Sequence, residues 1–100
     1  MGDKINYSEK VLERNLQKRV KEIGGKAYKF ISSNCTGVPD RLIIFNGRFC
    51  FAEIKSYNGR LAPRQEIEIR KLKNLGAKVF IVYTPEDIES IIKYITDERN

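Results

Sequence analysis

The chain has 100 residues, with 19 Lys and Arg against 13 Asp and Glu, so its net charge at pH 7 is +6. This length suits one domain with a single modest core, and we expect residues 1–100 to form it. The positive charge makes a polyanion such as nucleic acid the expected partner. Histidine is absent, which excludes Ser-His-Asp and Cys-His triads and histidine-based metal sites.

Cysteine content and hydropathy indicate the compartment. Cys35 and Cys50 are the only two cysteines, one in a predicted loop and one in a strand on the face opposite Glu53, which does not suggest a disulfide framework or a zinc site. No apolar run is long enough to span a membrane, and the charged N-terminus lacks the apolar segment of a signal peptide. We therefore expect a cytoplasmic protein with no membrane partner and no small-molecule cofactor.

The first elements are a helix and a short strand. Ser8 is the expected N-cap of a helix that ends at Gly24-Gly25, and its apolar stripe is Leu12, Leu16, Val20 and Ile23. Residues 27–31 favour a strand. Residues 32–37 are polar and predict a loop that leads into Pro39-Asp40.

A β-hairpin follows. Residues 41–45 and 48–52 are apolar, β-favouring runs separated by Asn46-Gly47, which suits a type I′ turn. The two-residue turn fixes the register, so that paired residues have numbers summing to 93. Asp40 then faces Glu53 at a non-hydrogen-bonded position, where Cα atoms approach to about 4.5 Å. Lys55 lies on the same face as Glu53.

The second half predicts a helix, a strand and a last helix. Pro63 starts a helix that runs to about Leu75 before Gly76, with Ile69, Leu72 and Leu75 facing inward. Residues 78–83 form a strand, and Thr84 caps a helix whose buried stripe is Ile88, Ile91, Ile92 and Ile95. The crossover makes the strands on either side of the first of these helices parallel. The predicted class is α/β, with a mixed central sheet flanked by helices.

The facing carboxylates of Asp40 and Glu53 are the main functional signal. They repel each other, and a divalent cation between them would hold them together. The neighbouring loops bring glycines and arginines to the same region, namely Gly37, Gly59, Arg60 and Arg64. Gln65 lies one turn before Ile69 and therefore points toward the sheet. Taken alone, the pattern also fits a turn aspartate beside a solvated salt bridge. We expect Phe49 and Phe51 to be core residues.

Three segments resemble the VRR-NUC domain of the PD-(D/E)xK nuclease superfamily. They are Gly37-Val38-Pro39-Asp40-Arg41, Phe51-Ala52-Glu53-Ile54-Lys55 and Gly59-Arg60-Leu61-x-Pro63-x-Gln65. The similarity covers most of the chain, and Glu13-Arg14-Asn15-Leu16 is also similar to the start of archaeal Holliday junction resolvases. A chain of this length resembles the stand-alone members carried by phages. The resemblance implies a restriction-endonuclease-like αβββαβα core.

The resemblance also implies a site. The catalytic residues would be Asp40, Glu53, Lys55 and Gln65. One or two Mg²⁺ or Mn²⁺ ions would be held by Asp40, Glu53 and the carbonyl oxygen of Ile54, with Glu13 binding directly or through water. Glu9, one turn earlier, is the alternative helix ligand. The residues expected to contact DNA are Lys29, Arg41, Arg60 and Arg64.

The function implied is metal-dependent, structure-selective DNA endonuclease activity on branched DNA such as a Holliday junction. The working form would be a homodimer, in the host cytoplasm if a phage encodes it. A non-catalytic nucleic-acid-binding module with a nuclease-like fold and an RNA-processing enzyme are the alternatives. The acidic set favours an enzyme, because carboxylates without metal would repel a phosphate.

Overall fold

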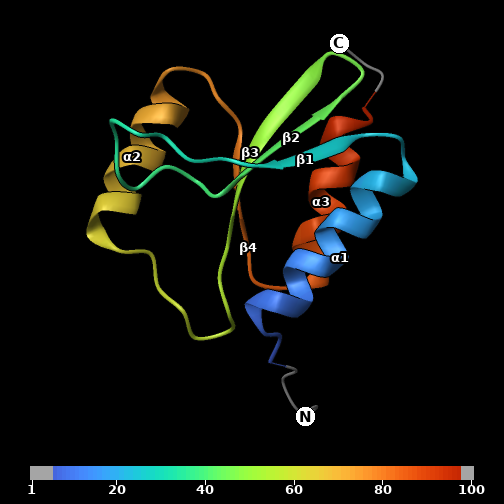
Figure 1. Ribbon diagram of the computed structural model, residues 1–100, viewed down its shortest axis with the longest axis horizontal. Helices are drawn as coiled ribbons and strands as arrows, with labels where there is room; N and C mark the ends of the chain where they lie inside the picture. The colour runs from blue at the N-terminus through green and yellow to red at the C-terminus, as the bar shows by residue number, and fades with distance from the viewer. Residues whose placement is uncertain (1–5, 98–100) are drawn as a thin grey trace.

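The structure is a computed structural model that describes residues 6–97 (Figure 1). The elements in chain order are α1 (Glu9–Glu22), β1 (Lys26–Lys29), β2 (Arg41–Phe45), β3 (Arg48–Ile54), α2 (Pro63–Asn74), β4 (Val79–Val82) and α3 (Pro85–Ile95). One four-stranded sheet has the order β1-β2-β3-β4. Its first two pairings are antiparallel and the β3–β4 pairing is parallel. The predicted α/β class and mixed sheet are therefore confirmed.

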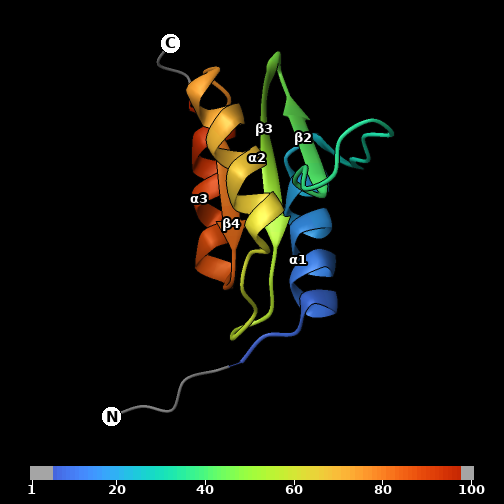
Figure 2. The ribbon, with the colours of Figure 1, turned by 90° about the vertical axis from the view of Figure 1, so that its left-hand side faces the viewer.

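The helices form a layer on each side of the sheet. Helices α1 and α3 lie side by side on one face, and α2 lies on the other (Figures 1 and 2). The main core fills the space between α1, α3 and the sheet, and its largest buried side chains include Leu12, Leu16, Ile43, Ile54, Ile88 and Ile91. Between residues 6 and 97, no helix is long and apolar enough to cross a bilayer.

Local sequence explains where the helices begin. Ser8 accepts a hydrogen bond from the Val11 backbone N–H at 3.1 Å and caps α1, as predicted. Thr84 and Asp87 form a reciprocal capping box at the start of α3. Both caps satisfy N–H groups that have no partner inside the helix. These two helices therefore start where their apolar stripes begin.

The hairpin has the predicted register. Asn46 and Gly47 both have positive φ, 51° and 83°, as a type I′ turn requires. The pairs Phe45–Arg48, Ile43–Cys50 and Arg41–Ala52 have numbers that sum to 93. Asp40 and Glu53 are the next pair outward, and they are in contact through a hydrogen bond from the Asp40 backbone N–H to Glu53 Oε1.

The face of the sheet that carries α2 is only partly covered. Helix α2 packs mainly against β4, so the positions nearest the hairpin turn remain open to solvent. Phe49 is 52% exposed and Leu75, the C-cap of α2, is 84% exposed. The predictions that Phe49 is a core residue and that Leu75 faces inward are therefore wrong. In addition, β1 spans residues 26–29 rather than 27–31.

Gly37 joins the loop before β2 to α2. Its φ is +88°, and a Cβ there would lie 2.6 Å from the backbone oxygen of Arg64. Gly76 also has a positive φ, +97°, but a Cβ there would meet no atom within 4 Å. The two glycines therefore share the need for a left-handed backbone, and only Gly37 is also held against other backbone.

We expect Gly37→Ala to reduce the free energy of unfolding clearly more than Gly76→Ala. Both changes place a side chain in the left-handed region, at about 1–2 kcal/mol, and Gly37→Ala adds an overpacking cost of about 1–3 kcal/mol. Urea unfolding of both variants measures the difference. Equal losses would show that the loop does not pack on α2 as described.

Candidate active site

The acidic pair lies at one end of the sheet, on the face that carries α2. Glu53, near the end of β3, is 4% exposed, and Asp40 directly precedes β2. Glu53 Oε1 accepts a hydrogen bond from the Asp40 backbone N–H at 3.1 Å. The hairpin register thus brings two carboxylates together in a largely buried position, where their repulsion is poorly screened by water.

Glu53 is also contacted by Lys55 and Gln65. Lys55 Nζ lies 3.4 Å from Glu53 Oε2, and Gln65 Nε2 donates a hydrogen bond to the same oxygen at 2.8 Å. The other end of the Gln65 amide accepts from the Ala62 backbone N–H at 2.9 Å, which fixes its orientation. Gln65 stands in the first turn of α2. The structure therefore assembles Asp40, Glu53, Lys55 and Gln65 from three separate segments.

The two carboxylates differ in how well their oxygens are satisfied. Asp40 Oδ1 is buried and has no hydrogen-bond partner among residues 6–97. Burial raises the pKa of Asp40 to about 6, and the negative charges of Glu53 and Glu13 add to the increase. A backbone hydrogen bond from Ile54 and the positive charge of Arg41 act in the opposite direction. A buried carboxylate in this condition favours a proton or a cation. Hard cations such as Mg²⁺ and Mn²⁺ prefer oxygen donors of this kind.

Glu13 does not join the acidic pair directly. Its Oε2 forms an ion pair of 2.7 Å with Arg41 Nη2, although its charge is close enough to raise the pKa of Asp40. Glu9, the alternative ligand, is exposed in the first turn of α1. In the part of the chain that the structure describes, no group of three or more acidic or cysteine side chains is arranged to hold a metal ion. Asp40 and Glu53 are the assembled part of the predicted ligand set.

Three of the four cations expected to contact DNA are exposed, namely Lys29, Arg60 and Arg64. Arg41 is not, because it is 7% exposed and turned toward Glu13. The expectation that Arg41 contacts DNA is therefore corrected. Strand alternation could have predicted this orientation, since Arg41 pairs with the buried Ala52 and so faces the core rather than the acidic pair.

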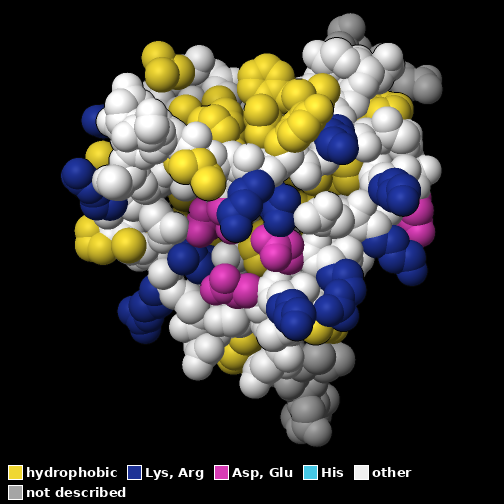
Figure 3. All heavy atoms as spheres, viewed as in Figure 1, with side chains coloured by type: hydrophobic (Ala, Val, Ile, Leu, Met, Phe, Trp, Pro, Cys, Tyr) yellow, Lys and Arg dark blue, Asp and Glu magenta, His cyan; other side chains and the backbone are white. Residues whose placement is uncertain are grey.

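Charge is unevenly distributed over this side of the molecule. Figure 3 shows acidic side chains near the middle of the face, Lys and Arg side chains around them, and apolar side chains gathered toward the upper edge. Acidic side chains surrounded by Lys and Arg suit a site in which the carboxylates bind a cation and the basic residues attract a phosphate. The upper apolar area belongs to the sheet face that α2 leaves open.

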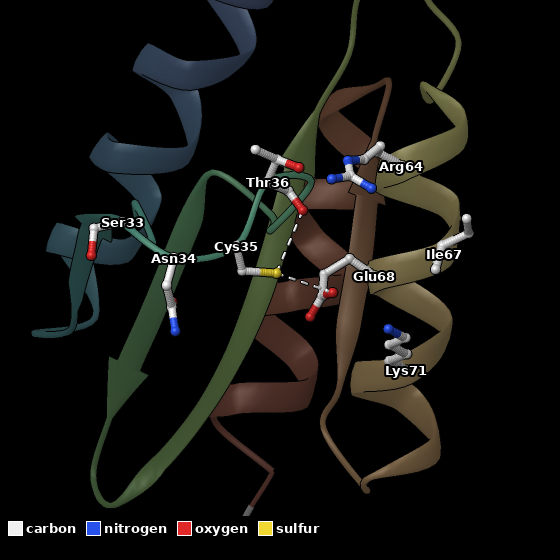
Figure 4. Close-up of a pocket in the computed structure, with 8 residues that line it drawn as sticks. All are labelled: Ser33, Asn34, Cys35, Thr36, Arg64, Ile67, Glu68 and Lys71. Atoms are coloured by element: carbon white, nitrogen blue, oxygen red, sulfur yellow. Dashed lines mark hydrogen bonds between the residues drawn. The ribbon is translucent and has the colours of Figure 1, made fainter.

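A pocket of about 470 Å³ lies between α2 and the loop before β2 (Figure 4). Cys35 Sγ donates a hydrogen bond to Glu68 Oε1 at 3.3 Å, and this bond raises the pKa of the thiol. Arg64 and Lys71 also line the pocket, whereas Asp40 and Glu53 do not. The pocket is therefore adjacent to the acidic pair and separate from it.

Comparison with known proteins identifies the class. No model of a protein family matches the chain. The chain is 42% identical over 82 residues to the "Putative nuclease p44" of Acyrthosiphon pisum secondary endosymbiont phage 1, an alignment covering 81% of this chain and 87% of that protein. A solved structure described as a "VRR_NUC domain" superposes with a TM-score of 0.78 and 25% identity, over 88% of this chain and 98% of that one.

Fold, site and relatives together define a nuclease. The chain belongs to the VRR-NUC family, as its three motifs predicted. The αβββαβα order agrees with that family assignment.

We expect Asp40→Asn to become progressively more stable than the parent as the pH rises from about 4 to about 7 in EDTA. The native pKa of about 6 lies above the ordinary aspartate value of 3.8, so the contribution of Asp40 to stability is complete below the lower value and is lost as the pH rises through the higher one. The loss is smaller than the full shift in pKa would give, because Asp40 is only partly buried and water screens its charge. Thermal unfolding at a series of pH values measures it.

Glu89→Gln is the matched control. Glu89 is paired with Arg19, which lowers the pKa of Glu89, so its contribution is present at neutral pH and is lost as the pH falls. The control therefore changes with pH in the opposite sense. A constant difference between Asp40→Asn and the parent would contradict a raised Asp40 pKa.

Proposed function

We propose that this protein is a divalent-metal-dependent DNA endonuclease that hydrolyses phosphodiester bonds at the Asp40–Glu53 pair. The observation that carries the proposal is the hydrogen bond from the Asp40 backbone N–H to the buried Glu53 carboxylate, next to an Asp40 Oδ1 that is buried without a partner among residues 6–97. A lysine lies beside them. The family assignment supports nuclease activity.

The donor set fits Mg²⁺ or Mn²⁺. Asp40 and Glu53 would supply carboxylate oxygens and Ile54 its carbonyl oxygen, with Glu13 acting through water. One or two ions would be held. A bound ion supplies Lewis-acid chemistry, since it neutralises charge on the scissile phosphate and lowers the pKa of a bound water.

The side chains of the site divide the remaining work. Gln65 and Lys55 hold the Glu53 carboxylate in one orientation, which preorganises the acidic pair. Lys55 would orient the attacking water or stabilise the charge that develops on the phosphate. The oxygen of water forms the new bond to phosphorus as the bond to the leaving oxygen breaks, and no covalent enzyme intermediate is required. Lys29, Arg60 and Arg64 would bind neighbouring phosphates.

A non-catalytic nucleic-acid-binding module is the alternative. Such a module would gain from uniform positive charge, and the acidic pair would weaken its binding. The buried position of Glu53 and its three contacts instead favour a site kept in one geometry. The same test that detects hydrolysis, run on DNA and on RNA of the same sequence, separates the module and the RNA-processing enzyme from the proposed function.

We expect Asp40→Asn, Glu53→Gln and Lys55→Ala each to abolish Mg²⁺- or Mn²⁺-dependent cleavage while the protein stays folded. Fluorescent duplex, flap and four-way-junction DNA, with EDTA as the blank, measure activity. In the parent, the ion also stabilises the fold by about RT ln(1 + [L]/Kd), roughly 2.7 kcal/mol at a hundredfold excess over Kd. Glu53→Gln should show little of this shift.

The matched controls are Glu86→Gln and Lys93→Ala, exposed residues of α3. Both should cleave like the parent. Cleavage by Asp40→Asn at the parental rate would refute the site, and an equal metal-induced shift in the parent and Glu53→Gln would place the ion elsewhere.

We further propose that the working form is a homodimer that prefers branched DNA. Cutting a four-way junction requires two symmetric incisions, which a twofold dimer supplies. The candidate interface is the open sheet face, defined as Leu42, Ile44, Phe49 and Phe51. These residues pair across β2 and β3 on the side of the sheet that carries Glu53.

The composition of the open sheet face favours a second copy over DNA. All four of its side chains are apolar in a chain whose residues are 32% charged, and DNA contacts need cations. Interface cores are depleted of charge and rich in aromatic residues. A standard interface takes about 800 Å² from each partner, a modest share of the total surface of 6881 Å². Ile67 of α2 and its C-cap Leu75 are also exposed apolar residues.

We expect Phe49→Gln to weaken self-association and to reduce the preference for junctions over linear duplex. Raising the salt from about 0.1 M to about 1 M should strengthen the parental dimer, because it screens the repulsion between two +6 chains. It should weaken DNA binding. Sedimentation and junction cleavage measure both effects.

Val11→Gln is the control, because Val11 is 47% exposed on α1, in the opposite layer. It should associate like the parent. A parent that is monomeric at tens of micromolar would rule out the dimer and leave the nuclease proposal standing.

A further inference from the structure

Arg41 places a buried positive charge directly behind the acidic pair. It follows Asp40 in the chain, but its side chain is on the opposite face of the sheet, because Arg41 pairs with the core residue Ala52. Only 7% of the residue is exposed. Its Nη2 donates to Glu13 Oε2 at 2.7 Å. Through Arg41, the residue after Asp40, the acidic pair is therefore connected to the Glu13 carboxylate on α1.

We propose that Arg41 is a positioning residue that holds the Glu13 carboxylate beside Asp40, so that Glu13 can complete the metal site. This inference rests on the proposed function, because it assigns a part in the same metal site. Glu13 uses Oε2 for Arg41, and its side chain is 40% exposed. Its second oxygen makes no hydrogen bond to any residue between 6 and 97, which leaves it available to a metal-bound water.

The guanidinium of Arg41 makes its side-chain contacts with α1. With the Gln17 amide oxygen turned toward it, Gln17 accepts from Nη2 at 3.2 Å and from Nη1 at 3.3 Å. The Nε atom is buried with no partner among the described residues. Gln17 lies one helical turn after Glu13, so both contacts come from the same side of α1. The fork of the arginine therefore fixes α1 and the Glu13 carboxylate relative to β2.

Stability alone does not explain an arginine at this position. Neighbouring inward-facing positions of the hairpin carry Ile43, Cys50 and Ala52. Burying a charged group costs free energy even when the group is paired, and Arg41 is the buried partner of this ion pair, whereas the Glu13 side chain is 40% exposed. An arginine that leaves its own Nε unsatisfied is a costly choice for packing. A role in setting the position of Glu13 accounts for it.

The test measures Mn²⁺ affinity without any cleavage, by electron paramagnetic resonance of free Mn²⁺ and by calorimetry. Residues that orient metal ligands typically change affinity by about 10- to 100-fold when removed. We expect Arg41→Met and Glu13→Gln each to weaken Mn²⁺ binding by about tenfold or more. The double variant should bind Mn²⁺ no more weakly than the weaker-binding of the two single variants, because both changes remove the same carboxylate from its place.

Arg41→Lys guards against loss of folding, since it keeps the charge but offers a point donor in place of a fork. It should bind Mn²⁺ more weakly than the parent and more tightly than Arg41→Met. Arg19→Met is the matched control. Arg19 forms ion pairs with Glu22 and Glu89 away from the acidic pair, so its removal should leave Mn²⁺ affinity unchanged.

Two results overturn the inference. One is parental Mn²⁺ affinity in folded Arg41→Met or Arg41→Lys, and the other is an additive double variant. A parent with no Glu53-dependent Mn²⁺ binding would refute the proposed function itself, so the two failures are distinguishable. A merely structural role for Arg41 would lower the unfolding temperature of Arg41→Met without changing Mn²⁺ affinity.

Discussion

The register of the β2–β3 hairpin is the constraint on which the site depends. A turn of Asn46 and Gly47 leaves one alignment in which Ile43 and Cys50 both enter the core, and a slip of one residue would turn both outward. That alignment also places Asp40 against Glu53. The energy that favours apolar burial therefore holds two like charges together, without any favourable interaction between the carboxylates themselves.

Glu53 then connects this hairpin to α2. Its carboxylate accepts hydrogen bonds from the Asp40 backbone and from Gln65, and it lies beside Lys55. Gly37, pressed against the backbone of Arg64, brings the loop before Asp40 onto the same end of α2. A small sheet with one helix on this face thus gains a fixed site, because each neighbouring segment is tied to a single buried side chain.

Sequence alone could predict those features that depend on local geometry. The turn dipeptide determined the pairing of Asp40 with Glu53, and the place of Gln65 one turn before Ile69 determined its direction. The pairing of Arg41 with Glu13 could not be predicted in that way, since it depends on how α1 crosses β2. The exposure of Phe49 and Leu75 depends on how much of the sheet α2 covers, which periodicity does not determine.

The two faces of the sheet differ in how their buried charged groups are paired. The α1 side pairs the buried Arg41 with Glu13, whereas on the α2 side Asp40 Oδ1 has no partner within the described range 6–97. A chain selected for stability alone would satisfy that oxygen, because an orphan buried acceptor costs about 1–3 kcal/mol. The α1 side is not fully satisfied either, because Arg41 Nε is buried without a partner in residues 6–97. In the proposed function a cation bound at Asp40 would satisfy its free oxygen, and the Arg41–Glu13 ion pair lies behind that position.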